Sequence, residues 1–149
     1  SYREAIRVEP QYADAWANLA FSLKKNEKTL HAIDALEQSI RCDPERFGLN
    51  YELGKLLLES GNAVSAEQKF KAVLKRSPLD PHVLNDLGNS LFAQGRFEEA
   101  RMSFSQAIEQ NNNFVAALNN LGSMFFMFPL NLLKFSNRSA FTENCNFLF

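Results

Sequence analysis

Apolar and small residues recur along this chain with a period of thirty-four positions. Within one period, apolar residues spaced three and four apart predict an amphipathic helix, and a second stripe of the same spacing predicts another. No segment shows the alternation typical of a strand. Because one helix pair cannot bury its apolar face alone, a repeat of this length indicates a stack of helix pairs. The first stripe is seen at Trp16, Leu19, Ala20 and Leu23, and the second at Phe97, Ala100, Phe104 and Ala107.

Turn-forming and small residues mark the same periods. Gly61 and Gly95 predict the end of a first helix, because a left-handed residue that ends a helix favours glycine. Asp80 before Pro81 predicts a helix start, with an acceptor side chain ahead of a proline whose missing N–H is not needed. One slot always holds a small residue, which lets the paired helices approach closely. That slot is occupied by Ala20, Gly54, Gly88 and Gly122.

The length of 149 residues, 46% of them apolar, suits one repeat array rather than two globular domains. The chain begins inside the pattern, so we expect it to be a fragment of a longer protein. Pro129 stands where a helix-ending glycine is expected, and the phenylalanine-rich segment after it departs from the period. This segment is an alternative terminus, a segment folded over the open end of the stack, or an unfolded tail. The predicted boundaries are 1–12 for the second helix of a truncated repeat, 13–46, 47–80 and 81–114 for three complete repeats, 115–128 for the first helix of a fourth, and 129–149 for the divergent tail.

Composition excludes several classes of function. A formal net charge of −1 and a pI near 6.1 provide no general attraction for nucleic acid. Cys42 and Cys145 lack the spacing of a disulfide framework or a zinc site. The apolar run 124–135 is shorter than the roughly 20 residues needed to cross a bilayer, so no membrane span is predicted. Without a recognisable signal peptide, we expect an intracellular setting, cytoplasmic or nuclear.

Catalytic chemistry has little support in the sequence. His31 and His82 are fifty-one positions apart, with no nucleophile and orienting acid in a recognisable arrangement. No glycine-rich phosphate loop is present, and Glu98 with Glu99 is better explained as a solvated pair at a helix start. We therefore expect a protein that is not an enzyme and that has no cofactor and no metal site.

The recurring slots resemble the tetratricopeptide repeat family, over about residues 1–128. The family's pattern of Trp-x-x-Leu-Gly-x-x-Tyr, then Ala-x-x-x-Phe, then Pro is met with substitutions. Ala20 replaces glycine, Leu36 replaces phenylalanine and Asn112 replaces proline. The resemblance implies an all-α fold of stacked helix-turn-helix repeats in a right-handed solenoid, whose first helices line a concave groove. It also implies protein or peptide binding rather than catalysis.

We number the slots of each repeat from its first residue, which is 13, 47, 81 or 115. In each first helix, slots four, seven, eight and eleven serve helix packing, and the remaining slots hold the residues that would face this groove. The sixth slot stands out, because carboxamides in a row offer both donors and acceptors to an extended peptide, and acids there favour a neutral or basic one. The alternative is that these are polar residues on a wet face that stabilise helix packing. The sixth slot holds Asn18, Glu52, Asp86 and Asn120. The complete predicted groove set is Asn18, Phe21, Tyr51, Glu52, Lys55, Asn85, Asp86, Asn89, Asn119 and Asn120, and the same face of the first repeat includes Asp14, Ala17, Lys24 and Lys25.

The residues at the fifth and sixth slots distinguish two known binding modes of the family. The clamp for the acidic C-termini of Hsp70 and Hsp90 chaperones needs cations that the fifth slots lack, so that partner is not expected. Sixth-slot asparagines instead resemble the superhelix of O-linked N-acetylglucosamine transferases, whose catalytic region would lie outside this chain. The fifth slots are Ala17, Tyr51, Asn85 and Asn119.

Three functions remain open. The favoured one is a non-catalytic scaffold that binds an extended peptide or partner segment. The others are a substrate-recognising part of a larger enzyme such as that transferase, and a structural assembly module that self-associates.

Overall fold

The computed structural model describes residues 10–127, and within that range the chain folds into seven α-helices and no strands. The predicted all-α repeat fold is confirmed. Of the predicted truncated repeat (1–12), residues 1–9 lie outside the described residues and residues 10–12 begin α2. The predicted divergent tail (129–149) lies entirely outside them, as does residue 128. The helices are α2 (Pro10–Lys25), α3 (Thr29–Cys42), α4 (Phe47–Glu59), α5 (Ala63–Leu74), α6 (Pro81–Ala93), α7 (Phe97–Gln110) and α8 (Val115–Met127).

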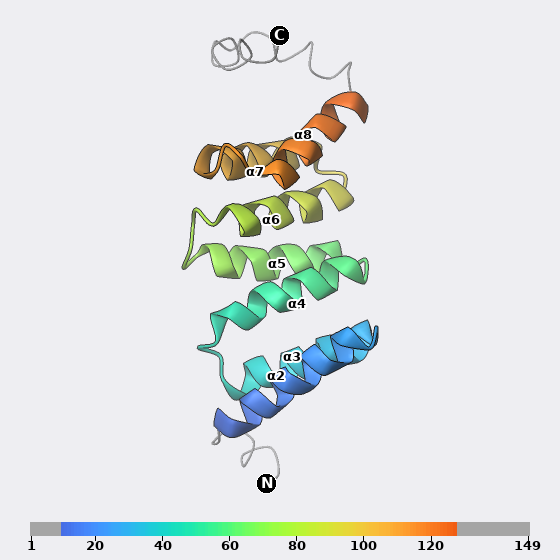
Figure 1. Cartoon of the computed structure of the whole chain (residues 1–149), viewed down its shortest axis with the longest axis vertical. Helices are drawn as coiled ribbons and strands as arrows, with labels where there is room; N and C mark the ends of the chain where they lie inside the picture. Colours follow the sequence, from blue (N-terminus) through green and yellow to red (C-terminus); the bar gives the residue numbers. More distant parts are fainter. Residues whose placement is uncertain (1–9, 128–149) are drawn as a thin grey trace.

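The helices form pairs that are stacked in chain order along the long axis of the molecule (Figure 1). Helix α2 packs on α3, α4 on α5, and α6 on α7, while the first helices α4, α6 and α8 also touch one another in succession. No helix in the described part of the chain is long and apolar enough to cross a membrane. The first helices therefore bring side chains from successive repeats onto one continuous face.

One large side chain fills the centre of each pair. Leu36, Phe70 and Phe104 follow one another at the thirty-four-residue period and are all almost fully buried. A Cβ atom added at Gly54 would lie 2.6 Å from Cε1 of Phe70, so the absence of a side chain leaves room for the ring. The predicted close approach of paired helices at this slot is thus confirmed. Burying each ring contributes roughly 2–3 kcal/mol of hydrophobic stabilisation.

The first helices end in turns of one kind. Gly61 and Gly95 adopt φ values of +86° and +76°, as the sequence predicts for helix-ending glycines. In each turn the following N–H donates to a carbonyl five residues back, which satisfies a helix-end acceptor. The first repeat makes the same turn with Glu27 at φ 58°, a left-handed conformation that is strained for a residue with a side chain. The turn geometry is therefore kept even where glycine is missing.

The start of α6 follows the predicted capping arrangement. The Asp80 side chain accepts hydrogen bonds from the backbone N–H groups of His82 at 2.9 Å and Val83 at 3.4 Å, and Pro81 occupies the first turn. This cap fixes where α6 begins, and with it the register of the side chains that α6 contributes to the shared face.

Candidate functional site

The polar side chains on the first helices form a continuous set of contacts, which we call the first-helix ladder. Hydrogen bonds and an ion pair between residues about one repeat apart join its four helices, and contacts within α4 and α6, including Lys55 over the Tyr51 ring, connect these links. Its members are Lys24 on α2, Tyr51, Glu52 and Lys55 on α4, Asn85, Asp86 and Asn89 on α6, and Asn120 on α8.

The link between α4 and α6 is made by Tyr51 and Asp86. The Tyr51 hydroxyl donates a 2.8 Å hydrogen bond to Oδ2 of Asp86, and the Asn85 amide donates to Oδ1 at 3.2 Å. Burial raises the pKa of the Tyr51 hydroxyl, and its bond to the Asp86 carboxylate raises it further. Within residues 10–127, Asp86 forms no ion pair, so its negative charge is held by neutral donors alone.

The link between α6 and α8 is made by amides. Nδ2 of Asn120 donates to Oδ1 of Asn85 and Oδ1 of Asn89, both at 3.0 Å. Asn85 is only 6% exposed, and both ends of its amide are bonded inside the ladder. By contrast, Oδ1 of Asn120 and Nδ2 of Asn89 have no partner among the described residues, and both side chains are partly exposed. These two atoms remain as a free acceptor and a free donor.

The link between α2 and α4 is ionic. Lys24 Nζ lies 3.4 Å from Oε2 of Glu52, and Lys55 Nζ lies 2.7 Å from Oε1 of the same carboxylate. The Lys55 ammonium also stands 4.6 Å from the centroid of the Tyr51 ring. Burial of Glu52 opposes ionisation, but the bonds from Lys55 and Lys24 outweigh it and lower the pKa of this carboxyl. Two cations therefore share one carboxylate.

Seven of the ten groove residues expected from the sequence belong to this ladder, and three do not. Asn18 and Asn119 are exposed, and their side chains make no hydrogen bond to another described residue, while Phe21 is 45% exposed. These three predicted side chains therefore make no hydrogen bond or ion pair that connects them to the first-helix ladder. The fifth-slot Ala17 is buried rather than on the accessible face.

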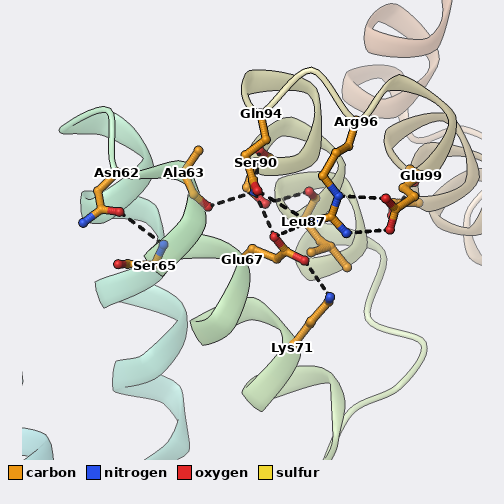
Figure 2. Close-up of polar contacts among 11 residues, drawn as sticks. Asn62, Ala63, Ser65, Glu67, Lys71, Leu87, Ser90, Gln94, Arg96 and Glu99 are labelled. Atoms are coloured by element: carbon orange, nitrogen blue, oxygen red, sulfur yellow. Dashed lines mark hydrogen bonds and ion pairs between the residues drawn. The ribbon is translucent and has the colours of Figure 1, made fainter.

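A second polar cluster, which the sequence analysis missed, lies away from the ladder and joins α5 to the turn between α6 and α7. Figure 2 shows Glu67 at its centre, with Lys71, Gln94 and Arg96 pointing toward the carboxylate. These three donate at 2.6, 2.9 and 2.7 Å, and Arg96 also makes two bonds to Glu99. Glu67 and Arg96 are 29 positions apart, so this pair of opposite charges does not follow the thirty-four-residue period, and the period gives no signal for it.

The electrostatics of this cluster follow from its geometry. Burial of Glu67 disfavours its charged form, but the hydrogen bonds from Lys71, Gln94 and Arg96 outweigh that effect and lower its pKa to about 2. The bond to Arg96 likewise lowers the pKa of Glu99. Because its charges are paired with one another, the cluster holds two repeats together and offers little to a ligand. No group of His, Cys, Asp and Glu side chains suited to a metal ion occurs in residues 10–127.

Two family models described as tetratricopeptide repeat match the chain, one over residues 19–81 and the other over residues 57–122. The chain belongs to the tetratricopeptide repeat family. The two matches together run through the helices that carry the ladder, so this shared face is built from the tetratricopeptide repeats themselves.

Known proteins and solved structures show how far the likeness extends. The peroxisomal targeting signal receptor of Eremothecium gossypii is 31% identical over 88 residues, which cover 54% of this chain and 15% of the receptor. The first tetratricopeptide repeat domain of Spaghetti (RPAP3), bound to an HSP90 peptide, superposes with a TM-score of 0.74 at 20% identity, covering 83% of this chain and 98% of that one. An O-GlcNAc transferase of Thermobaculum terrenum has a TM-score of 0.67 at 22% identity, covering 77% of this chain and 22% of that one. At these identities the structural likeness establishes the fold alone.

Proposed function

We propose that this tetratricopeptide repeat chain is a protein-interaction scaffold that binds an extended polypeptide segment along the first-helix ladder, with a preference for neutral or basic segments. The observation that carries the proposal is the Asp86 carboxylate. It lies at the middle of a face shared by four helices, partly exposed, and no cation within the described residues neutralises it.

The bonds that hold Asp86 are what make it useful to a partner. Tyr51 and Asn85 fix the orientation of the carboxylate from within the stack, so little side-chain entropy is lost when a further donor binds. A charged acceptor forms stronger hydrogen bonds than a neutral one, and a Lys or Arg side chain would also supply the missing counter-charge. The main-chain N–H of a neutral segment could use the same carboxylate.

Unpaired amide atoms extend this surface. The free Oδ1 of Asn120 and the free Nδ2 of Asn89 are an acceptor and a donor on neighbouring helices, and Asn18 and Asn119 offer complete exposed amides. A peptide backbone presents donors and acceptors in turn, so such amides can bind main chain with little demand on side-chain sequence.

The known relatives support a binding role without naming the partner. The RPAP3 domain carries an HSP90 peptide on a stack of the same fold. In this chain the fifth slots provide no lysine or arginine, so we assign it neutral or basic segments rather than acidic chaperone termini. The proposal gives no catalytic step to the described residues, in which His31 and His82 are both exposed and lie on different helices.

The test measures the affinity of fluorescein-labelled, unstructured twelve-residue peptides with net charges of +2, 0 and −2 by fluorescence anisotropy. We expect the basic pool to bind best, and Asp86→Asn, which keeps one acceptor oxygen but removes the charge, to weaken its binding about three- to tenfold. Asp34→Asn is the matched control, because Asp34 is exposed on the second helix α3. Equal binding of all three pools, or equal effects of the two variants, would contradict the proposal.

The amide contribution is tested separately. Asn18→Ala combined with Asn120→Ala should weaken binding of the neutral pool, whereas Gln68→Ala with Gln106→Ala, on exposed positions of α5 and α7, should not. Because Asn120 also bonds within the ladder, circular dichroism must show that the double variant keeps its helix content. Unchanged affinity in a folded double variant would remove the amides from the binding surface.

A further inference from the structure

The charges along the first-helix ladder are ordered rather than mixed. At its α2 and α4 end, Lys24 and Lys55 surround the single carboxylate of Glu52, which leaves a formal charge of +1. At α6, Asp86 contributes −1 with no cation beside it. Helix α8 carries no charged side chain between Val115 and Met127. The ladder therefore has a positive end, a negative centre and a neutral end.

The positive end retains capacity to bind an anion. The side chains of Lys24 and Lys55 are 37% and 30% exposed, and each ammonium has three donors, of which Glu52 uses one. The Lys24 contact of 3.4 Å is long for a charged pair, so this ammonium gains by turning toward a second carboxylate. One carboxylate cannot saturate both lysines.

The distance from the positive end to Asp86 at the centre of the ladder is set by the fold. Tyr51 lies between them, with its ring beneath Lys55 and its hydroxyl on Asp86, and the first helices α4 and α6 are neighbours. Neighbouring helices pack about 8–10 Å apart, and an extended chain advances about 3.3–3.6 Å per residue. A segment that crosses from the positive end to Asp86 therefore covers about three residues.

We infer that the ladder selects extended segments that carry an acidic residue against Lys24 and Lys55 and a basic residue about three positions away against Asp86. This rests on the proposed function and specifies the chemistry of the segment that it binds. Segments with only acidic residues meet Asp86 as a like charge, and segments with only basic residues meet the two lysines, so either kind is disfavoured relative to the mixed one.

The experiment uses four labelled ten-residue peptides in a neutral, unstructured background, with one Lys, one Glu, both three positions apart, or neither. A fifth peptide of the same length carries Lys and Glu at its two ends, nine positions apart, with the sequence between them kept neutral. With the unmodified chain, we expect the closely spaced peptide to bind at least about threefold tighter than any other, since both contacts form together only at that spacing.

Two variants test which part of the ladder binds each charge of the peptide. Lys24→Gln should weaken only the peptides that contain Glu, and Asp86→Asn only those that contain Lys, each by about threefold. The matched controls Lys69→Gln on α5 and Asp34→Asn on α3 should change nothing. The helix content of each variant is measured by circular dichroism alongside its affinity.

The outcomes distinguish failure of this inference from failure of the proposed function. If Asp86→Asn weakens the Lys peptide but the spacing of Lys and Glu has no effect, the binding face stands and the charge order is wrong. If no peptide depends on Asp86, both are wrong. Should Lys24→Gln lose helix content, the spacing comparison on the unmodified chain still decides the inference.

Discussion

The hydroxyl of Tyr51 donates a 2.8 Å hydrogen bond to the carboxylate of Asp86, which follows it by thirty-five positions and stands on the first helix of the next repeat. The bond is partly buried, and it joins two helices whose other contacts are mainly to their own partners. A single side chain therefore couples neighbouring repeats on the face that we assign to binding.

Replacing Tyr51 by Phe tests this coupling. The ring and its contact with Phe70 are kept, while Asp86 loses one of its two neutral donors and keeps the bond from Asn85. Bonds to charged groups are worth about 1.5–3 kcal/mol, and partial exposure reduces this, so we expect the free energy of unfolding to fall by about 1–2 kcal/mol in urea titrations. Tyr12→Phe, at an exposed position on α2, is the control and should leave it unchanged.

Glu27 occupies the left-handed position that glycine holds in the next two turns. Glu27→Gly should therefore relieve strain and increase the free energy of unfolding by about 0.5–1 kcal/mol, even though glycine gives the unfolded chain more freedom. Gln106→Gly, at an exposed position in the interior of α7, should instead decrease it by about 1 kcal/mol. Chemical unfolding of both variants checks the prediction, and destabilisation by both would argue against strain at Glu27.

Two glycines at the same repeat slot should respond oppositely to alanine. A Cβ atom at Gly88 would lie 2.5 Å from Cε1 of Phe104, whereas one at Gly122 meets nothing within 4 Å. Gly88→Ala should lower the melting temperature, with a loss of about 1–3 kcal/mol from overpacking. Gly122→Ala should raise it slightly, because alanine is the better helix former by about 1 kcal/mol. If both substitutions shift the melting temperature in the same direction, the absence of a side chain at Gly88 is not what makes room for the Phe104 ring.

Acid should weaken the cluster around Glu67. Its pKa falls from 4.5 in the unfolded chain to about 2 in the folded one, because the bonds from Lys71, Gln94 and Arg96 outweigh burial. The stabilisation is therefore complete above pH 4.5 and is lost as the pH falls from there toward about 2. For a side chain only 9% exposed, the loss is on the order of 3 kcal/mol.

Urea unfolding between pH 5 and pH 2 measures this loss as a difference between the unmodified chain and Glu67→Gln. The variant should be less stable at neutral pH and should lose less stability on acidification. Glu109→Gln, at an exposed position, should follow the unmodified curve. Parallel curves for all three proteins would show that Glu67 is not the group responsible.

The sequence predicted those parts of the structure that depend on one repeat alone. The small slot at Gly54 and Gly88 and the turns at Gly61 and Gly95 follow from local backbone and packing requirements, and each recurs often enough to be recognised. Leu19 and Leu118 are exceptions among the packing slots. They are 45% and 43% exposed, and they lie on α2 and α8, the first and last helices of the described residues.

The site could be predicted only as a set of residues on one face. That Asn85 is buried, and that Asn120 bonds to it, depends on how two repeats are placed relative to each other. The period does not contain that information, since a slot says where a side chain leaves its helix but not which atom of the next repeat it meets. For the same reason, the sequence did not predict the link between Lys24 and Glu52 or the link between Glu67 and Arg96.

The succession of helices, each touching its neighbours along the chain, also sets how fast this protein reaches its native state. The contacts between elements join helices that are consecutive or next but one, so the loops closed during folding stay short. Helical proteins dominated by such near-neighbour contacts cross the folding barrier in about microseconds to milliseconds. Each newly formed pair of helices then provides a surface on which the next can condense.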